Sequence, residues 1–188
     1  MIRSRKSRAA SVRTGPPLPL LLAAALLGAC APFPGRASTG TALSTEGIQS
    51  SGVVGNDHVK VGETWWFALP VPENTSREPV EITDVSVLHV PAGIEILEYG
   101  AYDINDTEGL PLLALEGDAH GPDFARLKNH IDDPVPVAAG AQSDIFYVAK
   151  MRIVAPPKGN TRQCRFTYRQ GDRQFTQTLD CEVSLRTT

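Results

Sequence analysis

The segment 144–154 constrains the fold most strongly, because one of its two strand faces is apolar along its whole length. Apolar side chains occupy every second position from Ile145 to Ile153, and Lys150 and Arg152 fall between them. A period of two residues places successive side chains on opposite faces of a β strand. The segment therefore predicts a strand that buries one face against a core.

Several other segments are rich in β-forming residues and are separated by turns that contain glycine or proline. Helical character is confined to Pro122–His130, whose proline suits a first helical turn. Short strands in this number predict an all-β domain, folded as an antiparallel β-sandwich. An immunoglobulin-like arrangement is the first expectation, and a cupredoxin-like sandwich is the alternative. The predicted strands are 64–69, 80–90, 94–102, 144–154, 164–169 and 175–185.

The last two predicted strands form a hairpin that carries a disulfide, with its turn at 170–173. A register that places Cys164 opposite Cys181 also places Phe166 opposite Leu179, so that both apolar faces lie on one side. Closing a loop of about 16 residues stabilises a fold by about 3 kcal/mol in the chain-entropy model. We therefore expect a disulfide between these two cysteines, with two reduced and buried thiols as the alternative.

The N-terminal 29 residues are organised like a secretory signal peptide. A segment with five Lys or Arg residues and no acid precedes an uncharged, Leu- and Ala-rich stretch, 18–29. This order is typical of an export signal. The apolar stretch is shorter than the roughly 20 residues that a membrane-spanning helix needs. The sequence therefore predicts secretion rather than a transmembrane anchor.

The residues Leu27, Gly28, Ala29 and Cys30 resemble the lipobox of bacterial lipoproteins, in which one aliphatic and two small residues precede an obligatory cysteine. The resemblance implies that 1–29 is a cleaved lipoprotein signal peptide. It also implies that Cys30 carries a diacylglyceryl group, with palmitate-type acyl chains, at the extracytoplasmic face of the cell membrane. Two acyl chains suffice for stable anchoring. An ordinary signal peptide followed by a chance cysteine is the alternative.

Residues 30–56 predict a flexible linker, and residues 57–188 the β-sandwich domain. Small or turn-forming residues (Ala, Gly, Ser, Thr and Pro) make up 17 of the 26 positions from 31 to 56. Such a segment buries too little apolar surface to offset the entropy of ordering it. A strand near Gly52–Val54 remains an open alternative.

The acidic balance of the mature chain argues against nucleic acid as a partner. Residues 30–188 contain 13 basic and 21 acidic residues, a net charge of −8. Such a surface repels phosphate backbones.

Candidate binding residues lie in two places. Trp65 and Trp66 are adjacent in a predicted strand and so point to opposite faces, where one of them could stack on a sugar or anchor a protein partner. Asp103 and Asp106 lie in 103–109, an acidic turn that echoes a calcium loop but fails the EF-hand pattern.

A candidate metal site consists of His120, Asp118 and Asp123, because imidazole and carboxylate groups are usual ligands of divalent cations. No cofactor motif and no local catalytic motif occurs, so we expect no cofactor and favour a role without catalysis. The chain is similar in pattern to small secreted lipoproteins of Gram-positive bacteria with one β-sandwich domain of unassigned activity. The sequence thus predicts a membrane-anchored binding module for an envelope protein or glycan that uses the connection 103–137. A cell-envelope hydrolase and a divalent-metal-binding lipoprotein are the alternatives.

Overall fold

The computed structural model describes residues 37–45 and 52–188 of the chain. The predicted signal peptide, Cys30 and part of the predicted linker lie outside the described residues. In the described ranges, no helix has both the length and the apolar character that a membrane crossing requires.

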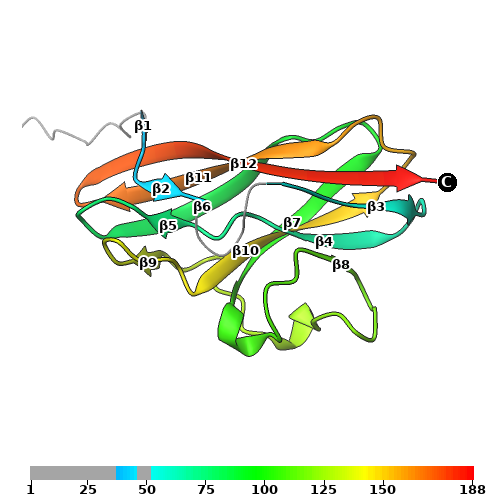
Figure 1. Ribbon diagram of the computed structural model, residues 1–188, viewed down its shortest axis with the longest axis horizontal. Coiled ribbons are helices and arrows are strands. Elements are labelled where there is room, and N and C mark those ends of the chain that lie inside the picture. The colour runs from blue at the N-terminus through cyan, green and yellow to red at the C-terminus, as the bar shows by residue number, and fades with distance from the viewer. Residues whose placement is uncertain (1–36, 46–51) are drawn as a thin grey trace, which may run out of the picture. The chain divides into compact units, whose positions relative to one another are not determined.

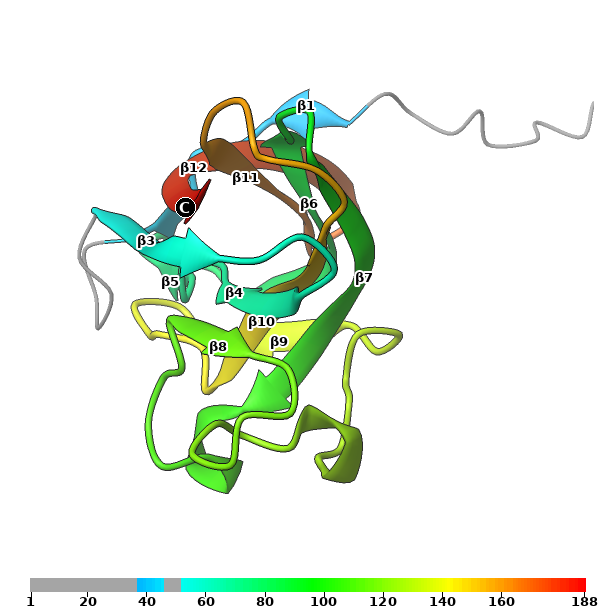
Figure 2. The same ribbon diagram turned by 90° about the vertical axis from the view of Figure 1, so that its right-hand side faces the viewer.

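The strands form two main sheets with a core between them, so the predicted all-β, sandwich-like fold is confirmed (Figure 1 and Figure 2). A third, two-stranded sheet pairs β2 (Leu43–Ser44) with β5 (Glu73–Asn74). The first main sheet has the order β1 (Ser38–Thr39), β12 (Arg173–Thr187), β11 (Thr161–Gln170), β6 (Val80–His89) and β9 (Val135–Val137), with β3 (Val53–Val59) also paired with β12. The second has the order β7 (Ile94–Asp103), β10 (Ile145–Ile153), β4 (Thr64–Ala68) and β8 (Leu113–Leu115).

The alternation predicted for β10 is confirmed by its burial. Tyr147, Met151 and Ile153 are buried in the main core, against residues of the first sheet such as Phe166. Lys150 lies on the opposite face, as predicted. That opposite face is also apolar for part of its length, because Phe146 and Val148 belong to a second, smaller core. β10 is therefore buried on both faces, and this second core supports the site described below.

The predicted disulfide is present, but the predicted register of its hairpin is wrong by two residues. Cys164 and Cys181 are bonded with their Cα atoms 5.8 Å apart, and Cys164 lies opposite Leu179 rather than opposite its disulfide partner. The two-residue turn pairs Gln170 with Arg173, and this pairing sets the register of the strands. A shift of two residues keeps the same side chains on each face, which is why the apolar match did not reveal it.

The predicted linker boundary is wrong for the described part of residues 30–56. β1, β2 and the beginning of β3 all fall in that range, and β1 and β3 pair with β12. The side-chain amide of Gln177 accepts a hydrogen bond from the Leu43 backbone N–H (3.0 Å) and donates one to the Leu43 carbonyl (2.6 Å). The Ala42 N–H donates to the Tyr168 hydroxyl at 3.1 Å. We call residues 38–44 the N-terminal strap.

Composition failed to predict the N-terminal strap because its stabilising hydrogen bonds come from residues distant in sequence, on β5, β11 and β12. The alternative strand near Gly52–Val54 is borne out by β3, which begins at Val53. β1 and β3 pair with β12 in parallel, so the first sheet is mixed rather than wholly antiparallel. The helix predicted at Pro122–His130 is reduced to one 3₁₀ turn, η2 (Phe124–Arg126).

Candidate functional site

The long connection between β7 and β9 packs on the outer face of the second sheet. Figure 2 shows its loops beyond β8 and β10, on the side away from β11 and β12. Phe124 attaches this connection to the sheet, with its ring centroid 4.7 Å from that of Trp66 and 4.8 Å from that of Tyr102. All three side chains are buried. This aromatic cluster fixes the position of loops that otherwise contain little regular structure.

A cavity of about 630 Å³ opens beside the aromatic cluster, and we call it the loop cavity. β7 and β10 supply its floor, and residues 116–129 supply its wall. Because carboxylates outnumber cations in the lining, the loop cavity favours hydroxyl-bearing or cationic groups over anions. The charged residues that line it are Glu98, Glu116, Asp118, Asp123, Arg126 and Lys150.

Lys150 organises the charges of the loop cavity. Its ammonium group lies 2.7 Å from a carboxylate oxygen of Glu116 and 3.1 Å from one of Glu98, and 4.9 Å from the ring centroid of Trp66. The hydrogen bond to Glu116 raises the pKa of Lys150, with Glu98 adding to the effect against a smaller opposing effect of desolvation. The lysine therefore stays charged at neutral pH and ties β10 to β7 and to the residue that follows β8.

Tyr102 and Asn129 also line the loop cavity, the first as a protonated phenol and the second as a hydrogen-bond acceptor. Burial raises the pKa of the Tyr102 hydroxyl, and the nearby Glu98 carboxylate raises it further, so the phenol stays protonated. Asn129 accepts hydrogen bonds through its Oδ1 from the backbone N–H groups of Ala101 (2.9 Å) and Ile131 (3.0 Å). Asn129 thereby fastens the wall of the cavity to β7.

Trp65 and Trp66 point to opposite faces of β4, as predicted. Trp65 is part of the main core, and its indole N–H donates to Glu63 at 3.1 Å. Trp66 belongs to the second core and lines the loop cavity. Each side chain is only 8% exposed, so neither presents the free ring face that stacking on a sugar requires. Of the two, Trp66 alone contributes to the candidate site.

Asp103 and Asp106 lie at the start of the connection, in and next to η1 (Ile104–Asp106). The Asp103 carboxylate accepts hydrogen bonds from the backbone N–H and the side-chain amide of Asn105, and these bonds hold its pKa below the usual range. This geometry caps the short 3₁₀ turn. Asp106 lines a neighbouring cavity of about 580 Å³ that shares Asp123, Arg126 and Leu127 with the loop cavity. The structure therefore does not bring these two carboxylates into the loop cavity.

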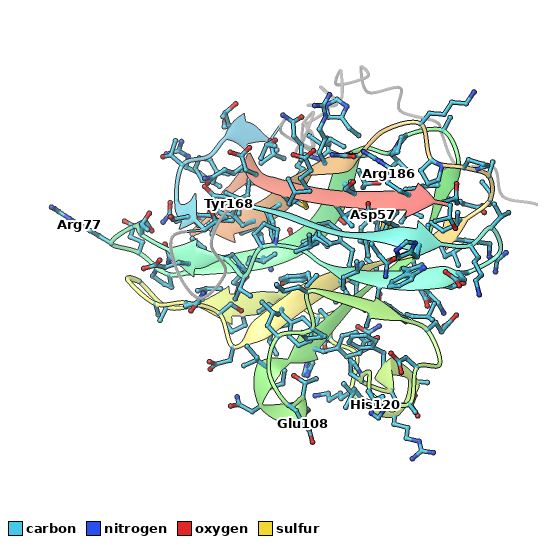
Figure 3. All side chains as sticks on the ribbon, turned by 45° about the vertical axis from the view of Figure 1, so that its right-hand side comes forward. Asp57, Arg77, Glu108, His120, Tyr168 and Arg186 are labelled. Atoms are coloured by element: carbon cyan, nitrogen blue, oxygen red, sulfur yellow. A yellow bond between two sulfur atoms is a disulfide. The ribbon has the colours of Figure 1, made fainter. Side chains whose placement is uncertain are left out.

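The candidate metal site at His120, Asp118 and Asp123 does not form. No group of three or more His, Cys, Asp or Glu side chains that could hold a metal ion occurs in residues 37–45 and 52–188. The His120 backbone N–H donates to Asp118 at 3.1 Å, and Asp123 pairs with Arg126 at 2.9 Å. Figure 3 shows His120 and Glu108 on the loops beyond β8. His120, Asp118 and Asp123 are close in sequence, but they form a polar loop rather than a convergent set of ligands.

Lys150, Glu98 and Glu116 were not predicted as site residues from the sequence. A weak signal existed, because Lys150 lies within a largely apolar strand and such a charge needs a partner. Its partners come from β7 and from the end of β8, which only the sheet order brings together.

Comparison with protein-family models and with curated protein sequences finds no match to this chain. The site must therefore be interpreted from its own geometry.

Proposed function

We propose that the protein is a lipid-anchored binding module at the extracytoplasmic face of a cell membrane, with the loop cavity as its recognition site. The loop cavity is the observation that carries the proposal, because it is built on a rigid sheet from loops that the aromatic cluster holds in place. The lipobox at Leu27–Cys30 supports the anchor. We expect a glycan or envelope protein that presents hydroxyl or cationic groups as the ligand.

The state of the charged groups supports binding over catalysis. The raised pKa values keep Lys150 charged and Tyr102 protonated, so neither serves as a nucleophile or base near neutral pH. The hydrolase alternative rests on one specific feature, the convergence of Glu98 and Glu116 on Lys150 within one cavity. Paired carboxylates can cleave glycosides. Hydrolysis of a bound glycan that is abolished by Glu116→Gln would establish the alternative.

The N-terminal strap limits how far the domain can lie from its anchor. Only seven residues separate Cys30 from Ser38, where β1 begins. Even fully extended, the eight Cα steps between these residues span about 28 Å. On this proposal the sandwich is held close to the bilayer surface, and ligands reach the loop cavity within the cell envelope.

For the fold, we propose an immunoglobulin-like arrangement, with a cupredoxin-like sandwich as the alternative. Successive strands of the chain pass between the two main sheets, and the β11–β12 hairpin carries a disulfide. Both features are compatible with an immunoglobulin-like arrangement. Such a label describes architecture and assigns no activity.

The anchor is tested by replacing Cys30 with serine in the expressing cells. The native chain should fractionate with membranes and carry the mass of a diacylglyceryl group. The C30S chain should lose that mass and leave the membrane fraction. A processed C30S chain that stays bound to the bilayer would contradict lipid anchoring.

The recognition site is tested by blocking the loop cavity. Ala125 is exposed at the cavity, so Ala125→Trp fills its mouth without disturbing the core. Ala139→Trp makes the same change at an exposed turn outside the cavity and is the matched control. In cross-linking and capture from intact envelopes, A125W should lose a specific partner that wild type and A139W retain. Equal capture by all three chains would contradict the proposed site.

A further inference from the structure

A second feature of the molecule, distinct from the loop cavity, lies where β11 begins. Gln163 adopts φ +63°, the one positive φ of a non-glycine residue in the described part of the chain, and the β11–β12 register shifts at this position. The in-out alternation of β11 breaks there, because Thr161 and Cys164 are both buried while Arg162 is exposed. A bulge of this kind re-aims a side chain, and backbone strain of this kind concentrates at functional positions.

Arg162 is thereby directed into a surface cavity of about 540 Å³, which we call the polar-end pocket. The pocket lies at the end of the sandwich where β6, β12 and the loop between β10 and β11 meet (Figure 1). In register, Arg162 lies opposite His89 on β6 and Glu182 on β12. Lys158, from the loop before β11, adds a second cation to the lining.

The only carboxylate of the pocket lining, Glu182, is hydrogen-bonded to a neutral side chain. Glu182 accepts a hydrogen bond from the side-chain amide of Asn160 at 2.5 Å. The carbonyl of the same amide accepts a bond from Arg186 at 2.6 Å. The ion pairs found in the described ranges include neither Arg162 nor Lys158. The pocket lining of this acidic protein thus carries two cations and a histidine against one carboxylate. Arg186, labelled in Figure 3, lies on β12.

We propose that the polar-end pocket binds a phosphate group, with Arg162 as the principal donor. The guanidinium fork of an arginine matches a phosphate in two parallel hydrogen bonds, and Lys158 adds a point charge that favours the dianion. His89 and the Asn160 side chain border the same space. The phosphate can belong to a lipid headgroup or to a free or polymeric phosphate of the envelope. This site is independent of the loop cavity.

The test uses ¹⁵N-labelled full chain carrying C30S, titrated with inorganic phosphate at constant ionic strength. Chemical shift changes should saturate and be confined to the pocket lining. Arg162→Gln should weaken the affinity at least about tenfold. Arg165→Gln is the matched control, because Arg165 is an exposed arginine on the same strand that does not line the pocket, and it should change the affinity less than about twofold.

Two further variants separate binding from folding. Arg162→Lys keeps the charge and should bind with intermediate affinity, and Gln163→Gly keeps the bulge and should bind like wild type. Vesicles of phosphatidylglycerol, compared with phosphatidylcholine, distinguish the sources. Arg162-dependent vesicle binding identifies a headgroup, and its absence alongside phosphate binding identifies a free or polymeric phosphate. The proposal is overturned if the shifts do not saturate, or if R162Q and R165Q weaken binding equally.

Discussion

Removal of the Cys164–Cys181 disulfide has an effect whose size follows from the structure. The bond joins residues 17 positions apart, which corresponds to about 3 kcal/mol of stabilisation in the chain-entropy model. Alanine at both positions avoids burying a new polar group at Cys164, which is fully buried. For a chain of this size, the melting temperature should fall by roughly 6–12 °C.

The assay is urea unfolding followed by tryptophan fluorescence, with the oxidised wild type, the reduced wild type and C164A/C181A compared at one pH. The reduced wild type and the double variant should both lose about 3 kcal/mol, and the slope of the free energy of unfolding against urea should rise because the unfolded chain expands. Adding reductant to the double variant is the control and should change nothing. A wild type whose melting temperature shifts by less than about 2 °C on reduction would refute the reasoning.

Three further changes have directions set by single contacts. The Tyr147 hydroxyl is buried without a hydrogen-bond partner, so Tyr147→Phe should raise the free energy of unfolding by about 1 kcal/mol. Burial also raises the pKa of this phenol, so stability should be lost as pH rises above about 10, where the unfolded chain ionises, and Y147F should flatten that loss in pH-dependent denaturation. A Cβ on Gly40 would lie 2.0 Å from the Tyr168 hydroxyl oxygen, so Gly40→Ala should speed hydrogen exchange in the N-terminal strap. Gly52 has open space around it, so Gly52→Ala is the control and should leave that exchange unchanged. Unchanged exchange in G40A would contradict the predicted clash. Phe124→Ala should remove about 3 kcal/mol of local packing and expose 104–130 to proteolysis while leaving the β11–β12 hairpin protected, and uniform loss of protection would contradict the separate role of the second core.

The candidate site shows what kinds of inference a single sequence supports. That the connection 103–137 carries a recognition surface stays a prediction, made because loops on rigid scaffolds carry function. This connection supplies the wall of the loop cavity, and strands supply its floor. The residues named for it within that connection were chosen by closeness in sequence. Asp103 caps a turn, and His120 does not meet two carboxylates. Convergent side chains come from separate strands, so their grouping depends on sheet order.

The register of the β11–β12 hairpin likewise could not be predicted from the sequence. Apolar matching and the cysteine pair both selected a pairing that is off by two residues, because a period of two cannot distinguish registers that differ by two. The turn geometry at Gly171, with φ +58°, decides between them. The bulge at Gln163 then brings Cys181 within bonding distance of Cys164.

Local sequence alone determined the all-β class, the strands β4, β6, β7, β10, β11 and β12, the two faces of β4 and β10, and the identity of the disulfide partners. Each of these depends on side-chain alternation or on a short turn, which are properties of neighbouring residues. The tertiary structure alone decided that the N-terminal strap belongs to the domain, that Lys150 meets Glu98 and Glu116, and that Arg162 faces outward. These features depend on hydrogen bonds and charges supplied by strands distant in sequence, and the free energy of such contacts appears only when the sheets have assembled.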